Sequence, residues 1–282
     1  MVVESGGDGG IPVKSEDLRA DRPVCAPGVD SEDGEHCFPA ALVERIAEDV
    51  GAGSSSRAAV EEKTGCDSER CLVSKVSSGE LRKEAAGHLR PQAPEQWRGD
   101  PTAWLSNHDI DRVMRQYADC HPDFAYLGAL PLDFDAKGMF TACRVNAACE
   151  LTLADLARRR QRYLGVIVNT DPQGKPGRHW MACFLNVGSG VFTFFDSVGK
   201  PPRPEIRGFC ERLAEGYRGT CRYPATLRWS TKRFQHANTE CGVYAALFLA
   251  TMADGGSFRK FLRNRMNDED VNALRRRFFD FS

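Results

Sequence analysis

Residues 179–198 read HWMACFLNVGSGVFTFFDSV, and this stretch decides the fold. Two apolar runs rich in aromatic and β-branched residues flank the short turn at Gly188–Gly190, which is the pattern of a β-hairpin. A run that comes earlier in the chain, YLGVIVNT at residues 163–170, is continuously apolar and ends in turn residues, as in a buried strand. Together the three runs predict a small, mainly antiparallel sheet.

An apolar helix is predicted to pack on this sheet. Residues 240–253, ECGVYAALFLATMA, are apolar on every side, which is typical of a buried helix. The run is too short to cross a bilayer, which takes about 20 apolar residues, so we expect no membrane partner. Amphipathic patterns at residues 102–120 and 258–279 predict covering helices. The predicted fold class is therefore α+β, with one central helix.

Composition divides the chain into three parts. Residues 1–34 are rich in Gly, Asp, Glu and Ser and lack apolar periodicity, so we expect disorder there. Residues 35–95 hold short helical patterns and end in PQAP, which reads as a hinge after an N-terminal helical arm. Residues 96–282 carry the predicted sheet and the central helix and form the main domain.

Cysteine usage predicts an intracellular protein. The chain has 11 cysteines, an odd number, and its first residues include no apolar leader. We therefore expect mostly reduced thiols, with Cys143, Cys149 and Cys183 filling the core.

Charge is nearly balanced overall but is unevenly distributed. The net charge is −1, whereas the first 50 residues are acidic and the Arg-rich stretch 259–277 is basic. A basic face in the C-terminal half can contact nucleic acid or an acidic protein, and a solvated helix face is the simpler alternative.

Four residues form a candidate set for thiol chemistry. Cys241 opens the apolar helix, where the partial positive charge of a helix N-terminus favours thiolate. His179 begins one hairpin strand and suits the role of base, and Asp196 ends the other strand at the same edge of the sheet. Gln235 precedes the cysteine by six residues and offers an amide N–H for an oxyanion. Each residue alone also fits a structural role, but their ordered combination is hard to meet by chance.

With these residues the sequence resembles the cysteine proteases specific for ubiquitin-like proteins and the adenovirus maturation protease. The resemblance rests on GRHW (177–180), FFDS (194–197), QHANTECGVY (235–244) and WLSNHDI (104–110). It covers residues from about 97 to the C-terminus. It is closest to the polyprotein-processing proteases of African swine fever virus and other large DNA viruses, through LGALPLDF (127–134) and DPQGKPGRHW (171–180). Arg178 stands where those proteases usually have Ser, and Ser106 where the SUMO proteases have Asn.

The resemblance implies a papain-like catalytic domain over residues 96–282 that needs no metal or cofactor. It implies that Cys241 is the nucleophile, His179 the base, Asp196 the partner of the base and Gln235 the oxyanion donor. Trp104 and Trp180 would clamp a narrow substrate channel, and Gly242 would leave room beside the sulfur. Such a channel admits residues without a Cβ, so the expected cleavage site follows a Gly-Gly-like sequence.

Three functions remain open at this point. The first is a viral protease that processes structural polyproteins during virion maturation, in the host cytoplasm and the virion. The second is an isopeptidase that removes SUMO or ubiquitin. The third is a non-enzymatic zinc-binding or scaffold module that uses His36, Cys37, Cys66 and Cys71, although their spacing lacks a Cys-x2-Cys pair.

Overall fold

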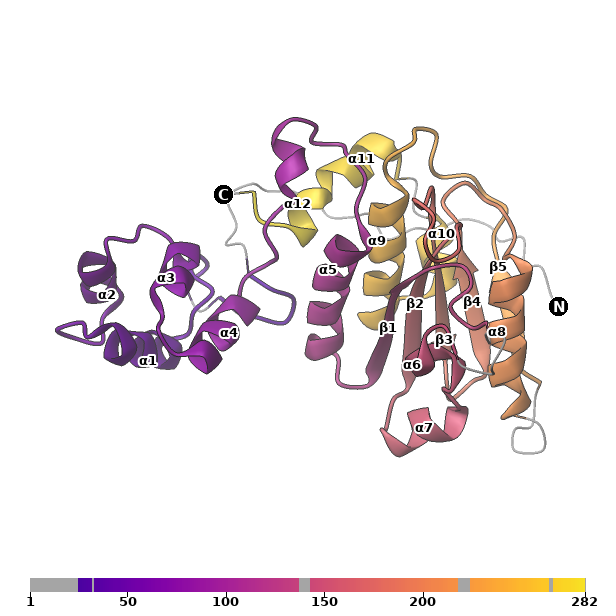
Figure 1. Cartoon of the computed structure of the whole chain (residues 1–282), viewed down its shortest axis with the longest axis horizontal. Coiled ribbons are helices and arrows are strands. Elements are labelled where there is room, and N and C mark those ends of the chain that lie inside the picture. Colours follow the sequence, from indigo (N-terminus) through magenta and orange to yellow (C-terminus); the bar gives the residue numbers. More distant parts are fainter. Residues whose placement is uncertain (1–24, 32, 137–142, 218–223, 264–265, 282) are drawn as a thin grey trace. The chain divides into compact units, whose positions relative to one another are not determined.

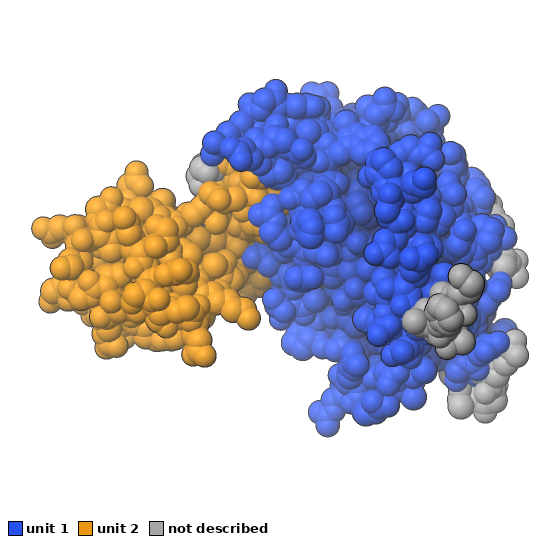
Figure 2. Space-filling model, viewed as in Figure 1, with its two compact units in different colours: residues 1–14, 94–275 blue, residues 15–93, 276–282 orange. Residues whose placement is uncertain are grey.

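The chain forms two compact units, which Figure 2 colours separately. The computed structural model describes residues 25–31, 33–136, 143–217, 224–263 and 266–281. Within these, the larger unit holds residues 94–275 and the smaller unit, the arm, holds residues 25–93 and 276–281.

The sequence had placed residues up to 282 in the main domain, whereas residues 276–281 group with the arm. The physical reason is a backbone pairing inside the arm, because the amide of Asp280 donates to the carbonyl of Pro91 and its carbonyl accepts from Ala93.

A five-stranded mixed sheet forms the centre of the larger unit. The strands are β1 (Phe124–Leu130), β2 (Tyr163–Asn169), β3 (Trp180–Asn186), β4 (Val191–Phe195) and β5 (Thr226–Trp229), in the order β1-β2-β3-β4-β5. The two inner pairings, β2–β3 and β3–β4, are antiparallel, as the hairpin pattern predicts. The two outer pairings are parallel, because β1 and β5 reach the sheet through longer connections.

Helices cover both faces of this sheet (Figure 1). One face buries a core shared with α6 (Asn146–Cys149), α7 (Leu153–Arg158) and α8 (Pro204–Glu215). The other face carries α5 (Asn107–Cys120) and α9 (Cys241–Ala253). The remaining elements of this unit are η2 (Glu95–Arg98), α10 (Phe258–Arg263) and α11 (Asp268–Ala273). The last helix, α12 (Arg275–Phe278), begins at the last residue of this unit, and its other residues group with the arm.

The central helix, α9, is buried along its whole length. Every residue of α9 except Thr251 is buried, in keeping with its all-round apolar sequence. Phe248 of α9 stacks on Phe195 of β4 with ring centroids 5.3 Å apart. In β2, a Cβ on Gly165 would lie 3.2 Å from Leu249 and 2.7 Å from Phe124, so a glycine lets α9 approach the sheet. The predicted α+β class with a central helix is confirmed, and no described helix is long and apolar enough to cross a membrane.

The arm is a four-helix unit with its own apolar core. Its helices are α1 (Ala40–Val50), α2 (Arg57–Thr64), α3 (Glu69–Lys75) and α4 (Gly79–Gly87). Serines at positions 56, 68 and 78 cap α2, α3 and α4 by accepting backbone N–H groups of the first turns. Apolar side chains from all four helices form the core, among them Leu42, Ile46, Val60, Leu72 and Leu81.

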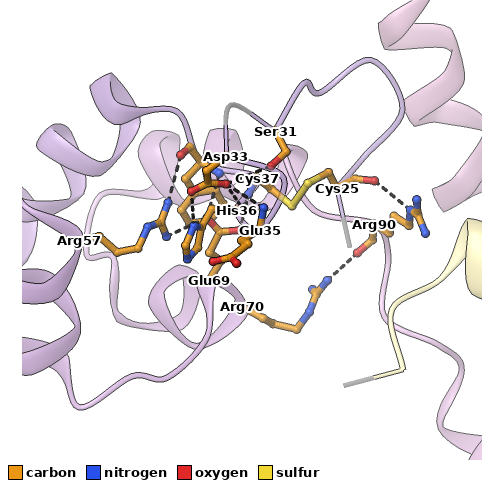
Figure 3. Close-up of a disulfide and its surroundings, with 11 residues drawn as sticks. Cys25, Ser31, Asp33, Glu35, His36, Cys37, Arg57, Glu69, Arg70 and Arg90 are labelled. Atoms are coloured by element: carbon orange, nitrogen blue, oxygen red, sulfur yellow. Dashed lines mark hydrogen bonds and ion pairs between the residues drawn. A yellow bond between two sulfur atoms is a disulfide. The ribbon is translucent and has the colours of Figure 1, made fainter. Parts of the chain in front are cut away.

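Glu69 ties the start of α1 to the rest of the arm (Figure 3). Its carboxylate accepts the backbone N–H groups of Cys37 and Phe38 at 2.8 and 2.9 Å. Arg57 pairs with the same carboxylate at 2.9 Å and also donates to the carbonyl of Phe38. One side chain therefore fixes the chain entering α1 through two amides and an ion pair.

Three disulfides contradict the expectation of mostly reduced thiols. The bridges are Cys25–Cys37, Cys66–Cys71 and Cys143–Cys149, so Cys143 and Cys149 are bonded to each other instead of filling the core as free thiols. All three bridges close short loops. The number of cysteines and the first residues of the chain do not indicate which cysteines lie close together in such loops. Cys183 is unbridged and buried, with its sulfur 3.8 Å from that of Cys210.

The first bridge also alters the expected boundary of the disordered N-terminus. Residues 1–24 and 32 lie outside the described residues, so the disorder expected over residues 1–34 stays a prediction for them. Cys25 and Ala26, however, are buried in the arm. The bond to Cys37 and a hydrogen bond from Arg90 to the carbonyl of Cys25 hold this segment in place (Figure 3).

We expect Glu69→Ala to destabilise the arm by about 2 kcal/mol, because two backbone amides and Arg57 lose their acceptor at a part-buried site. Hydrogen exchange of the α1 amides measures the effect and should be faster in the variant. Glu62→Ala, at an exposed position of α2, is the matched control and should exchange like the wild type. Equal α1 exchange in all three proteins would contradict this role of Glu69.

Candidate active site

Cys241 lies at the first residue of α9, buried beneath the surface at the N-terminus of the 13-residue helix. The carbonyl of the preceding residue, Glu240, already accepts a bond from Tyr244, so the helix is formed from its first turn. The unpaired N–H groups of this turn carry partial positive charge, which stabilises a thiolate. The side chain of Cys241 lies near enough to His179 to raise the pKa of its imidazole.

His179 and Asp196 meet where the central hairpin opens. His179 immediately precedes β3 and Asp196 immediately follows β4, and the antiparallel pairing brings the two positions to the same edge. The Nε2 atom of His179 lies 2.8 Å from Oδ1 of Asp196. The same carboxylate oxygen accepts the backbone N–H of Val198 at 2.8 Å. With Nε2 engaged, Nδ1 is the ring nitrogen left for Cys241.

The pKa of His179 is raised to about 9. Burial alone would lower it, since desolvation disfavours the imidazolium. The hydrogen bonds to Asp196 and Cys241 and the negative charges of both groups act in the opposite direction and together outweigh the effect of burial. The geometry therefore favours a charged imidazolium at neutral pH.

The loop before His179 is held by its own polar contacts. Asn169, at the end of β2, accepts the backbone N–H groups of Asp171 and Arg178. Gly177 has φ 77°, and a Cβ there would lie 2.6 Å from the Asn169 amide, so this position needs glycine. Arg178 pairs with Asp171 at 3.1 Å across the same loop. Arg178, which departs from the family pattern, thus stabilises the loop that leads into His179.

Gln235 is buried beside the start of α9, and both ends of its amide are engaged. Its Oε1 accepts the hydroxyl of Ser197 at 2.7 Å, and its Nε2 donates to Glu240 at 3.3 Å. The backbone N–H of Gln235 donates to the carbonyl of Ser197 at 2.9 Å. In the described part of the chain, the second N–H of this amide donates to no other group. The contacts fix which end of the amide faces α9 and leave one donor for a ligand.

A buried polar network that no sequence motif indicated supports this amide. Glu240 accepts from Asn272 Nδ2 at 3.0 Å and from the Thr239 hydroxyl at 2.8 Å. Asn272 in turn accepts from Arg275 at 2.8 Å. The network therefore runs from Gln235 through Glu240 and Asn272 to a buried guanidinium.

Arg275 ties this network to the chain that precedes α5. Its guanidinium donates to the carbonyls of Ala103, Thr102 and Thr239 at 2.8, 2.9 and 3.2 Å and lies 4.4 Å from the Trp97 ring centre. Burial lowers its pKa to about 10, against the opposing negative charges of Glu240, Asp100 and Cys241, so it stays charged at neutral pH. No sequence signal distinguished it from the adjacent Arg276 and Arg277.

The structure brings Trp180 and Gly242 together through Leu105. The Trp180 indole donates to the carbonyl of Leu105 at 3.0 Å and is buried. A Cβ on Gly242 would lie 3.1 Å from Leu105 and 3.3 Å from Trp180, so this contact is close. Trp104, next to Leu105, is 39% exposed and is one of the few large exposed apolar residues. The predicted clamp thus has one buried and one exposed indole.

The proposed zinc ligands do not form a site. Cys37 is bonded to Cys25, and Cys66 is bonded to Cys71, so none of these sulfurs is available as a thiolate ligand. His36 instead pairs with Asp33 in the arm (Figure 3). Among the described residues no group of three or more His, Cys, Asp and Glu side chains could hold a metal ion.

Comparison with known proteins identifies the class. Residues 159–281 match the C-terminal catalytic domain of the Ulp1 protease family. The part of the chain that holds Cys241, His179, Asp196 and Gln235 thus matches a cysteine protease family, which confirms the resemblance predicted from the motifs.

Its relatives include proteases of large DNA viruses. The chain is 29% identical to a thiol protease of Acanthamoeba polyphaga mimivirus, over 75% of this chain and 68% of the relative. It is 26% identical to a cysteine protease of African swine fever virus, over 77% of this chain and 84% of the relative. A crystal structure of the African swine fever virus protease shares the fold, with a TM-score of 0.66 and 19% identity, over 95% of this chain and 99% of that one.

We expect His179 to titrate near pH 9 and both Cys241→Ala and Asp196→Asn to lower its pKa. Each substitution removes a hydrogen bond and a negative charge that raise the pKa, and burial still lowers it. Nitrogen-15 NMR of the imidazoles over pH 5–10 measures the change. An unchanged His179 titration in the variants would contradict the pairing.

Proposed function

We propose that the chain is an endopeptidase in which Cys241 is the nucleophile, His179 the general acid and base, Asp196 its orienting partner and Gln235 an oxyanion donor. The observation that carries this proposal is the continuous polar line from the Asp196 carboxylate through His179 to the sulfur at the start of α9. A carboxylate that holds the imidazole at 2.8 Å, beside a thiol at a helix N-terminus, is the arrangement that thiol acyl transfer requires.

The chemistry follows from these positions. The Cys241 thiolate attacks the scissile carbonyl carbon, and the carbonyl π electrons move to oxygen. The free amide N–H of Gln235 and the backbone N–H of Cys241 stabilise this oxyanion. His179 gives its proton to the leaving amine as the C–N bond breaks, which leaves a thioester. His179 then takes a proton from water, which attacks the thioester and regenerates the thiolate.

The substrate class is a polypeptide with a Gly-Gly-like sequence before the cleaved bond. The close packing of Leu105, Trp180 and Gly242 beside Cys241 supports this choice, because it leaves little width for side chains at the residues next to the sulfur. Exposed Trp104 supplies an apolar surface at the same place. We assign the cleavage to viral structural polyproteins during virion maturation in the infected cell, in line with the viral relatives.

A second candidate substrate is a ubiquitin-like protein. Some of the African swine fever virus relatives carry the name SUMO-1 cysteine protease, which favours this alternative. The chemistry would be the same, and recognition of the folded modifier would be an added requirement.

A reporter panel tests the function directly. Purified full-length chain should cleave a Gly-Gly-x peptide, and Cys241→Ser should abolish cleavage because the hydroxyl is a much weaker nucleophile in this setting. Cleavage of a SUMO or ubiquitin reporter in place of the peptide would move the assignment to the second candidate. Peptide cleavage retained in Cys241→Ser would reject the proposed nucleophile.

Glu240 is expected to act on catalysis through Gln235. We expect Gln235→Ala to lower kcat by roughly 10² to 10³. Glu240→Gln should lower kcat by roughly tenfold, or about 1.4 kcal/mol, with KM almost unchanged, because the amide loses its charged anchor. The double variant should be no worse than Gln235→Ala alone, since the effect of Glu240 passes through that amide. Additive losses would indicate an independent role, and exposed Glu205→Gln is the matched control.

A further inference from the structure

A cavity of about 980 Å³ lies in the larger unit, on the face of the sheet that carries α9. Met252 and Gly255, at the C-terminal end of α9, line it. Because α9 has 13 residues, this end lies about 18 Å along the helix from Cys241. The cavity is therefore separate from the candidate active site.

The floor of the cavity is a row of side chains across three strands. Phe184 of β3 pairs with Thr193 of β4, and Thr193 pairs with Arg228 of β5, so all three lie on the same face of the sheet. All three line the cavity. The floor is therefore aromatic at one end and cationic at the other.

Glycines at the end of α9 leave this part of the sheet uncovered. Gly255 has φ 80°, and a Cβ on Gly256 would lie 2.4 Å from the carbonyl oxygen of Thr251. These two residues let the chain turn away directly after the helix. α10 then forms a wall of the cavity through residues that include Phe258 and Leu262.

Cations from three elements surround the cavity. Arg228 comes from the floor, Lys232 from the segment after β5, and Arg259 and Arg263 from positions four residues apart on α10. The side chain of Lys232 is held in place, because its Nζ donates to the carbonyl of Leu262 at 3.0 Å. Within the described residues, neither Lys232 nor Arg259 forms an ion pair.

Among the described residues, none that lines the cavity carries a carboxylate. It does contain the hydroxyl groups of Ser189, Thr193, Ser230, Thr231 and Ser257. Lys232 and Arg259, which form no ion pair among the described residues, share this hollow with five hydroxyl groups, and such a set suits an anion with several oxygen atoms, as in a chain of phosphates.

The opposite end offers a surface for a flat ring. Tyr163 and Phe184 line the cavity and stack on each other with ring centroids 5.5 Å apart. A cavity of this volume accommodates a molecule of nucleotide size. From this arrangement we infer that the cavity binds a nucleotide, with its phosphates among Arg228, Lys232, Arg259 and Arg263 and its base against the aromatic end.

The basic C-terminal half was expected to contact nucleic acid, and the cavity assigns such a contact to only some of its basic residues. Of the Arg-rich stretch 259–277, the residues Arg259 and Arg263 line the cavity, whereas Arg275 is buried in the network behind the candidate active site. Only some basic residues of this stretch are therefore placed to contact a bound nucleotide. The chemistry of the site is the same whether the nucleotide is free or part of a single strand.

Isothermal titration of the full-length chain with ATP, in 150 mM salt without divalent metal, tests the site. We expect the Lys232→Ser/Arg259→Ser variant to bind at least about tenfold more weakly, because two phosphate contacts are lost. Arg98→Ser/Lys83→Ser removes the same charge from exposed positions outside the cavity and should bind like the wild type. Circular dichroism checks that each variant folds. Equal weakening in both variants would place binding elsewhere and overturn the inference.

Two further ligands identify the source of the nucleotide. Tripolyphosphate should bind more weakly than ATP, because it lacks the ring, and equal affinity would overturn the nucleotide assignment. Tighter binding of single-stranded oligothymidylate, lost in the cavity variant, would support the same site with a nucleic acid as its source. No binding of ATP, tripolyphosphate or the oligonucleotide at millimolar concentration would overturn the proposal. Binding is measured without proteolysis, so the result is independent of the proposed function.

Discussion

The packing of α9 against the central hairpin is the constraint on which the rest of the larger unit depends. A helix that is apolar on every side must be enclosed, and the sheet on one side and α5 beside it do so. Its N-terminus then lies at the edge where β3 begins and β4 ends, which places Cys241 beside His179 and Asp196. The geometry of the candidate site is thus a consequence of the core.

The start of α9 is buried together with negatively charged groups, whose desolvation is unfavourable, and the polar network compensates for it. Glu240 and a Cys241 thiolate are negative groups at a buried helix terminus, and the nearby positive groups are the His179 imidazolium and Arg275. Neither cation is solvated in full, so each depends on hydrogen bonds to carbonyl and carboxylate oxygens. Glu240 belongs to the same network and orients Gln235 by accepting a hydrogen bond from its amide. Charge balance and the placement of an oxyanion donor therefore have one structural origin.

The sequence predicted what depends on local pattern and motif order. The hairpin, the apolar helix and the juxtaposition of His179 with Asp196 follow from strand periodicity and the shared edge of adjacent strands. It did not predict the role of Arg275. In the sequence RRRF this arginine cannot be told from the two that follow it, and only tertiary packing buries it. The disulfides were missed for a similar reason, since cysteine count and cellular compartment do not report that Cys66 and Cys71 approach each other across a short loop.

The departures from the family motifs also have local physical explanations, and these connect the motifs to each other. Ser106 is the N-cap of α5 and forms a capping box with Asp109, so it performs the capping role itself and fixes the backbone just after Leu105. The Leu105 carbonyl is the acceptor of the Trp180 indole, next to His179. Arg178 closes the loop on the other side of His179 through Asp171. Ser106 and Arg178, the two residues that depart from the motifs, thus stabilise the segments that precede and contact the start of β3, where His179 lies.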